Sequence, residues 1–143
     1  MTDQLPLPYS DYTVRLPFES EWEWAARGAL VGADYPTGRP SAEDRFLTEG
    51  TQGPSPVGGS AANGYGLRDM SGNVWEWCMD WYDSNYYKKS PTENPKGPST
   101  GHYRVLRGRS WYGSDKYIRS ADRYRYNPDT RNAYDGFRIV VAP

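Results

Sequence analysis

The sequence predicts an α+β domain that is rich in loops, with one or two helices and several short strands. Its 143 residues are about the length of one domain. The 15 glycines and 12 prolines interrupt regular structure and argue against a large helix bundle. Only 36% of the residues are hydrophobic while 15% are aromatic, so we expect the core to depend mainly on aromatic rings.

One helix is predicted over residues 18–28. Trp22 and Ala26 lie on the same face at helical spacing, which gives the helix an apolar side. Acidic residues in the first turn interact favourably with the helix dipole, and Gly28 suits the C-terminal cap. Phe18 at the start has no capping side chain, which we expect to cost about 1 kcal/mol.

Short strands are predicted at residues 74–77, 104–106 and 137–142, where apolar and aromatic residues follow turn-forming residues. Two prolines oppose a helix in residues 1–14, which we expect to form an extended arm. No internal repeat or linker divides the chain, so residues 1–143 are predicted to form one domain.

The composition also limits the classes of partner that we expect. The net charge of -1 gives no electrostatic reason to expect nucleic acid or an anionic membrane as the ligand. No segment approaches the ~20 apolar residues of a membrane span, and residues 1–13 show no basic region followed by an apolar core, so no secretory signal is visible in them. We therefore expect synthesis in the cytoplasm. The single cysteine, Cys78, excludes an intrachain disulfide, and we expect it to be a small core residue.

The block from Asn63 to Trp77 combines a Gly-rich turn with a short aromatic strand. Asp69 and Glu76 place two carboxylates on either side of that turn. Calcium is bound by carboxylates together with backbone carbonyls, which turns containing glycine expose. The block is therefore a candidate cation site. The alternative is a turn in which Asp69 only caps backbone amides.

The same block has the sequence NGYGLRDMSGNVWEW, which resembles the signature of the formylglycine-generating-enzyme (sulfatase-modifying factor) family. The resemblance covers roughly residues 15–142 and implies a C-type-lectin-like fold with short strands and many loops. Further matching segments follow in the family's order: residues 15–17, 21–28, 104–108, 110–111, 119–121 and 136–138.

For the cation site, the resemblance implies a structural Ca²⁺ ion. Asp69 and Glu76 would supply side-chain oxygens, and Gly72 and Val74 would supply backbone carbonyls. Such an ion would stabilise a chain that consists largely of loops.

For catalysis, the sequence departs from the family's enzymes. The two cysteines that the oxidases need to bind copper would fall at Gly113 and Ile118. The iron-dependent members, which form sulfur–carbon bonds, need several His or carboxylate ligands, whereas His102 is the one histidine here. We therefore expect no copper, no iron and no enzyme activity. The alternative is a formylglycine-generating-type oxidoreductase, or a fragment of a sulfoxide-synthase-like enzyme, that acts with a missing domain.

Residues 112–135 have a composition typical of antibody-like binding loops. Tyr, Ser, Asn, Asp and Gly dominate, and in such loops tyrosines supply rigid contact area while small polar residues supply adaptable hydrogen bonds. Between residues of the family framework lie the candidate contact residues Tyr112, Gly113, Ser114, Asp115, Tyr117, Ile118, Asp122, Tyr124, Arg125, Tyr126, Asn127, Thr130, Asn132, Ala133, Tyr134 and Asp135.

This layout resembles the variable proteins of diversity-generating retroelements, in which adenines of Asn-type codons are randomised. Such codons cannot yield Lys, Glu, Gln, Met or Trp, and none of these occurs at the candidate positions; Lys116 would be framework. The resemblance implies a ligand-binding protein whose five tyrosines in residues 112–135 anchor a protein or glycan. It leaves the oligomeric state and the final location open, with a virus particle or a cell surface among the options.

Two alternatives remain for this region. It can be a solvated, tyrosine-rich loop without a ligand, or part of a structural accessory domain. The accessory domain predicts no exposed aromatic cluster.

Overall fold

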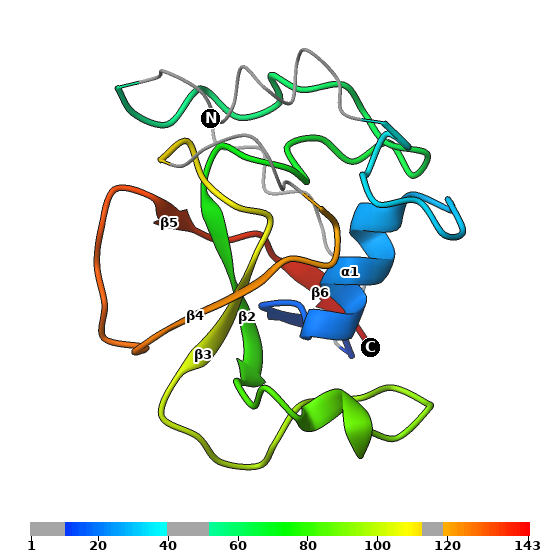
Figure 1. Ribbon diagram of the computed structural model, residues 1–143, viewed down its shortest axis with the longest axis vertical. Helices are drawn as coiled ribbons and strands as arrows, with labels where there is room; N and C mark the ends of the chain where they lie inside the picture. Colours follow the sequence, from blue (N-terminus) through cyan, green and yellow to red (C-terminus); the bar gives the residue numbers. More distant parts are fainter. Residues whose placement is uncertain (1–10, 40–51, 113–118) are drawn as a thin grey trace.

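A four-stranded sheet with the helix α1 (Glu19–Arg27) on one face forms the centre of the fold (Figure 1). The computed structural model describes residues 11–39, 52–112 and 119–143, and the account below concerns these residues. They include a short 3-10 helix, η1 (Tyr86–Lys88). The strands are β1 (Thr13–Arg15), β2 (Trp75–Trp81), β3 (Arg104–Arg107), β4 (Arg123–Tyr126), β5 (Asp135–Gly136) and β6 (Val140–Ala142).

The strand order in the main sheet is β4-β3-β2-β5. Strands β2, β3 and β4 pair antiparallel, whereas β5 pairs parallel to β2. A second, two-stranded sheet joins β1 to β6 antiparallel, with Val14 opposite Val141. Long loops connect most of these elements (Figure 1), as the content of glycine and proline predicts.

The helix predicted over residues 18–28 is confirmed, and its ends show how it starts without a capping side chain. The Phe18 N–H donates to the Glu21 carboxylate at 2.8 Å, and the Glu19 N–H donates to the Asp80 carboxylate at 2.6 Å. Asp80 belongs to β2, so a strand supplies the cap that Phe18 lacks. Gly28 ends the helix in the left-handed region with φ 53°, where glycine is favoured.

The two faces of the main sheet differ in character. On β2, Glu76, Cys78 and Asp80 are buried and lie on the side of α1. Cys78 is 1% exposed, which confirms it as a core residue, and burial raises the pKa of its thiol well above the ordinary range. The opposite face is open to solvent and carries Trp75, Trp77, Met79 and Trp81.

The core is less aromatic than we expected. Trp22 is the one aromatic residue among the buried hydrophobic residues described, where it packs with Ala26, Met70, Cys78 and Val105. Most other rings among the described residues are exposed or half-buried, including Trp75, Trp77 and Trp81 on the face of the sheet opposite α1.

The strand predictions are confirmed in position but not in length. Strand β2 extends four residues beyond the predicted 74–77, and β3 also includes Arg107. Strand β6 is shorter than the predicted 137–142, because Arg138 turns to Glu76 while Phe137 remains 68% exposed. Strands β4 and β5 lie in a region for which no strand is predicted.

Candidate ligand-binding site

A pocket of about 410 Å³ opens beside the main sheet, next to the end of β2 that adjoins β5. Its walls come from β2, from β4, from the segment after β3 and from the loop before β5. The lining residues are Trp75, Arg109, Ser110, Tyr112, Asp122, Arg123, Tyr124, Tyr126 and Tyr134.

Strand β4 supplies two of the tyrosines because its residues alternate between Arg and Tyr. Tyr124 lies opposite Leu106 and Tyr126 lies opposite Arg104 in the ladder with β3. In an extended strand, successive side chains point to opposite faces of the sheet. The tyrosines therefore share the open face, while Arg123 and Arg125 point toward the other.

The rings of the pocket contact one another in pairs. Tyr124 stacks on Trp75 with 5.2 Å between ring centroids, and Tyr112 stacks on Tyr134 at 5.8 Å. Tyr126 meets Tyr124 edge to face at 5.1 Å. Tyr112 is 72% exposed and Tyr124 is 43% exposed. The pocket thus presents preformed aromatic surface to solvent.

The tyrosine hydroxyls influence one another. Burial, followed by hydrogen bonds to Tyr124 and Tyr134, raises the pKa of Tyr126. The Tyr126 phenol therefore stays neutral at physiological pH and can act as a donor or acceptor toward a ligand.

Carboxylates add polar groups near the rings. Asp122 accepts hydrogen bonds from the Arg119 side chain and lies 3.6 Å from Arg109. Asp135 accepts a hydrogen bond from the Asn132 amide at 2.7 Å, and burial raises the pKa of its carboxyl. The Oδ1 atom of Asp135 is buried and has no hydrogen-bond partner among the described residues.

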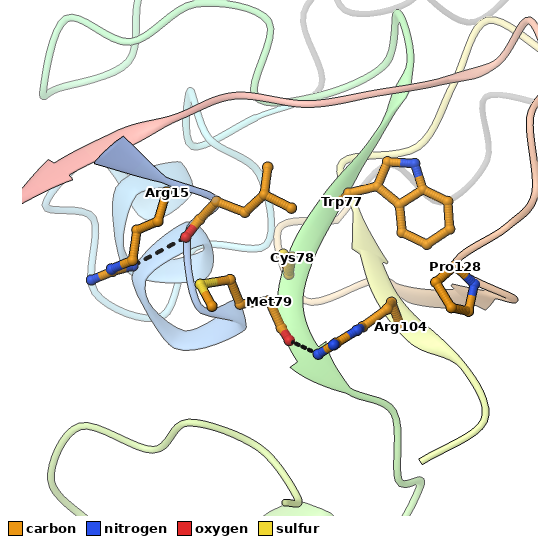
Figure 2. A pocket seen from close by; sticks show the side chains of 7 residues that line it. Arg15, Trp77, Cys78, Met79, Arg104 and Pro128 are labelled. Carbon is orange, nitrogen blue, oxygen red and sulfur yellow. Dashed lines mark hydrogen bonds between the residues drawn. The ribbon is translucent and has the colours of Figure 1, made fainter. Parts of the chain in front are cut away.

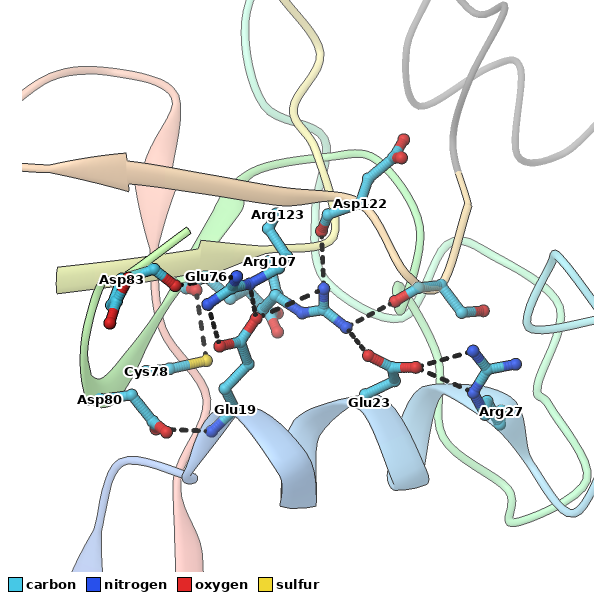
Figure 3. A network of polar contacts seen from close by, with 11 residues as sticks. Glu19, Glu23, Arg27, Glu76, Cys78, Asp80, Asp83, Arg107, Asp122 and Arg123 are labelled. Atoms are coloured by element: carbon cyan, nitrogen blue, oxygen red, sulfur yellow. Dashed lines mark hydrogen bonds and ion pairs between the residues drawn. The ribbon is translucent and has the colours of Figure 1, made fainter. Parts of the chain in front are cut away.

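A buried network of charges holds the pocket on α1 (Figure 3). Arg107 is fully buried and donates to Glu23 at 2.5 Å and to the carbonyls of Ser120 and Asp122 at 2.8 and 2.9 Å. These two carbonyls belong to the segment that leads into β4. Arg107 therefore fixes the position of the strand that carries Tyr124 and Tyr126.

Arg123 continues this network from the pocket wall. Its guanidinium donates to both carboxylate oxygens of Glu19 at 2.6 and 2.9 Å. Glu19 is 3% exposed, so the pair is almost completely removed from water. Arg107 and Arg123 thus each pair with a carboxylate of α1.

The structure brings together only part of the predicted contact set. Five of the candidate residues line the pocket: Tyr112, Asp122, Tyr124, Tyr126 and Tyr134. Arg125 instead lies over the ring of Tyr82, on the other face. Other members lie in the turn after β4 or beside β5, outside the lining: Asn127, Thr130, Asn132, Ala133 and Asp135. The remaining candidates, Gly113, Ser114, Asp115, Tyr117 and Ile118, lie outside the described residues.

Four lining residues are missing from the set predicted from the sequence: Trp75, Arg109, Ser110 and Arg123. Trp75 was recognisable as part of an aromatic strand, but its partner Tyr124 is distant in sequence. Ser110 donates to the Tyr112 carbonyl and accepts from the Tyr112 N–H, and so it shapes the turn that presents this ring.

The four residues predicted to bind Ca²⁺ line a second pocket of about 270 Å³. The Asp69 carboxylate accepts the backbone N–H groups of Gly58 and Ser60. Burial opposes ionisation of Asp69, but these hydrogen bonds outweigh it and lower the pKa of its carboxyl. Asp69 is thus ionised at neutral pH, as a cation ligand requires.

Glu76 has an arginine as its neighbour in this second pocket. Its carboxylate accepts from Trp22 Nε1 at 2.6 Å and from Arg138 Nε and Nη2 at 2.5 and 2.8 Å. Arg138 also donates to the carbonyls of Arg68 and Asp69. Two carboxylates converging on one pocket fit a calcium ion in donor chemistry, while Arg138 competes for Glu76. The calcium site therefore stays a prediction.

Other metal and membrane features are limited. Across residues 11–39, 52–112 and 119–143, no cluster of three or more His, Cys, Asp or Glu side chains is arranged to hold a metal ion. In the same ranges, no helix has the length and apolar character needed to cross a membrane.

Comparison with known proteins identifies the family. The model of the sulfatase-modifying factor enzyme 1-like domain matches residues 7–143. The chain therefore belongs to this family, and its predicted α+β fold of the C-type-lectin-like type is confirmed.

Individual relatives have different names. The formylglycine-generating enzyme of Streptomyces coelicolor is 43% identical over 149 residues, covering 88% of this chain and 46% of the relative. The serine/threonine-protein kinase pkn1 of Chlamydia pneumoniae is 44% identical over 130 residues, covering 88% of this chain and 20% of the relative.

Among solved structures, Treponema denticola variable protein 1 is similar with a TM-score of 0.74 and 33% identity, covering 90% of this chain and 47% of that one. The chain thus spans about half the length of the formylglycine-generating enzyme and of the variable protein that it matches.

Proposed function

We propose that this chain is a ligand-binding protein that uses a diversified, tyrosine-rich surface to bind a protein or a glycan, in the manner of a retroelement variable protein. The observation that carries the proposal is the convergence of Tyr112, Tyr124, Tyr126 and Tyr134 with Trp75 on one open pocket. Residues from four separate segments meet there beside the main sheet.

The physical properties of the pocket support binding. Tyr and Trp offer large contact area at a low cost in side-chain entropy, and they dominate the energetics of many interfaces. The ring pairs are already formed, so little ordering is needed when a ligand arrives. The ion pair of Arg107 with Glu23 holds the segment that carries these rings, and neither residue lines the pocket.

The similarity to Treponema denticola variable protein 1 supports the same proposal. A domain that matches 20% of a protein named as a kinase also indicates that this fold occurs in proteins of different roles.

An enzymatic role is the second candidate, because relatives of 43% identity are named formylglycine-generating enzymes. The copper chemistry that the family resemblance implies requires two thiolates, and this chain has one cysteine. Cys78 is buried among Trp22 and Val105, and its pKa is raised. The donor set does not fit copper, so we expect no formylglycine when the chain is incubated with copper and a cysteine-containing sulfatase peptide. Formation of the aldehyde, detected by mass spectrometry, would favour the enzyme.

The binding proposal is tested with a glycan array and a displayed peptide library. The variant Tyr112→Ser/Tyr134→Ser removes one stacked pair from the pocket, and we expect bound ligands to lose at least about 10-fold in affinity. The melting temperature should change little, because Tyr112 is largely exposed.

Tyr65→Ser is a matched control, since Tyr65 is 41% exposed and stacks on Trp24 outside the pocket. Equal losses in the control and the pocket variant would contradict the proposal. A neighbouring DNA copy of the region encoding residues 112–135, differing mainly at adenines and lying beside a reverse transcriptase gene, would support diversification.

A further inference from the structure

A separate pocket of about 420 Å³ lies on the open side of β2 (Figure 2). It shares no lining residue with the tyrosine pocket. Its lining is mostly apolar, with two arginines at its border: Leu16, Trp77, Cys78, Met79, Pro128, Arg15 and Arg104.

The apolar part of this pocket lacks a cover in the described structure. Trp77 is half-buried and Met79 is 37% exposed, and both point away from α1. Pro128 follows β4 and Leu16 follows β1, so segments distant in sequence form the walls. A pocket of this size is sufficient for a small organic molecule.

The two arginines differ in whether their charge is satisfied. Arg15 makes a two-pronged ion pair with Glu21, with distances of 2.7 and 2.8 Å. Arg104 has no carboxylate within ion-pair distance in the described part of the chain. Arg104 is therefore the cation at this pocket with charge to offer a ligand.

The guanidinium of Arg104 is also held in place. It lies over the ring of Trp81 at 3.6 Å from the centroid, and its Nη1 donates to the Met79 carbonyl (Figure 2). Among the described residues, Nε and Nη2 of Arg104 have no hydrogen-bond partner. Stacking and one hydrogen bond thus fix the plane of a group that retains two donors on one side.

We infer that this pocket binds a small apolar carboxylic acid, with the ring or chain of the ligand against Trp77 and its carboxylate on Arg104. Two adjacent guanidinium donors match the two oxygens of a carboxylate. The apolar walls match the ring or chain of a small organic acid. The inference does not depend on the tyrosine pocket, because the two sites share no lining residue.

The test uses ¹⁵N-labelled protein titrated with N-acetylphenylalanine and followed by NMR at the indole N–H of Trp77. We expect saturable shifts with a Kd of about 1 mM or tighter, in the range of a ligand this small. N-acetylphenylalaninamide lacks the charge and should bind at least about 10-fold more weakly. N-acetylglycine lacks the ring and should also bind at least about 10-fold more weakly.

Substitutions of Arg104 test whether its charge binds the carboxylate of the ligand. Arg104→Gln should weaken N-acetylphenylalanine at least about 10-fold, and Arg104→Lys should fall between, because lysine lacks the planar fork. Arg39→Gln is the control, since it removes an exposed guanidinium that does not line this pocket. If Arg104→Gln fails to fold, the comparison of acid and amide on the unmodified protein still decides.

Three results would overturn the inference. The first is equal affinity for the acid and the amide. The second is an unshifted Trp77 signal at saturating ligand. The third is binding of the peptide Gly-Gly-Gly-Phe at least about 10-fold more tightly than N-acetylphenylalanine, because that would assign the pocket to a peptide C-terminus instead of a small acid.

Discussion

The buried carboxylate of Asp80 is expected to lower the stability of the folded protein at neutral pH. It lies in β2, is 4% exposed, and accepts the Glu19 N–H at the start of α1. Burial, together with the negative charge of Glu19, raises the pKa of its carboxyl from 3.8 to about 6, although the hydrogen bond from the Glu19 N–H opposes the shift. Folding therefore disfavours the ionised carboxylate, and Asp80→Asn removes this cost while keeping an acceptor oxygen for the helix.

The expected gain in the free energy of unfolding follows from the size of the pKa shift of Asp80. Each unit of pKa corresponds to about 1.4 kcal/mol, so ionised Asp80 costs up to about 3 kcal/mol above pH 6. Asparagine keeps one acceptor oxygen, but its amide nitrogen replaces the second carboxylate oxygen, which accepts from the backbone of Asp80 itself. Losing that hydrogen bond reduces the gain in stability by about 1 kcal/mol. We expect Asp80→Asn to be more stable than the unmodified protein by about 1–2 kcal/mol at pH 7.5.

The sign of the pH dependence is fixed by proton binding. Between pH 4 and 6 the folded protein holds the Asp80 proton more tightly than the unfolded chain. The contribution of Asp80 to stability is therefore complete below about pH 4 and is lost as the pH rises through 6. The variant lacks this loss, so the difference in the free energy of unfolding should grow from pH 4.5 to 7.5.

Urea denaturation of both proteins at several pH values measures this difference. A variant that is less stable at pH 7.5, or a difference that does not change with pH, would refute the argument. A difference that does not change with pH would show that the pKa of Asp80 is not raised by folding.

Three further predictions concern the network, the cation site and a turn. Arg107→Met should lower the free energy of unfolding by about 3–5 kcal/mol, because it removes the buried donors to Glu23 and to the carbonyls of Ser120 and Asp122; urea denaturation tests this, and a change below about 1 kcal/mol would contradict it. Calcium at 100-fold excess over its Kd should stabilise the protein by about 2.7 kcal/mol. Asp69→Ala should abolish this effect in thermal melts. An equal response to calcium in the variant and the unmodified protein would exclude a site there. Gly108→Ala should cost more than 2 kcal/mol, because φ is +90° and the new Cβ would lie 2.9 Å from the Trp22 ring; unchanged denaturation would show that the turn can relax.

Local signals in the sequence account for the features that we predicted correctly. The helix over residues 18–28 depends on neighbouring residues, namely a helical apolar face and Gly28 at its end. The positions of β2 and β3 follow from short apolar and aromatic segments, and the burial of Cys78 follows from its place in such a segment. These features involve contacts close in sequence, which single-sequence patterns describe well.

Longer-range features were predicted incompletely. The length of β6 depends on Arg138, which leaves the strand direction to reach Glu76 across 62 residues. The start of α1 depends on Asp80, which is 61 residues from Glu19. Neither partner is visible from a pattern of local spacing.

The sequence by itself determined the family, the helix over residues 18–28, the positions of β2 and β3 and a tyrosine-rich segment near the C-terminus. Only the tertiary structure decided which tyrosines meet. The alternation of β4 directs Tyr124 and Tyr126 to the open face while it directs Arg125 away, and strand pairing brings Trp75 within stacking distance of Tyr124. Composition specifies which side chains are present, but register and pairing decide which of them share a surface, because a shift of one residue in a strand reverses its faces.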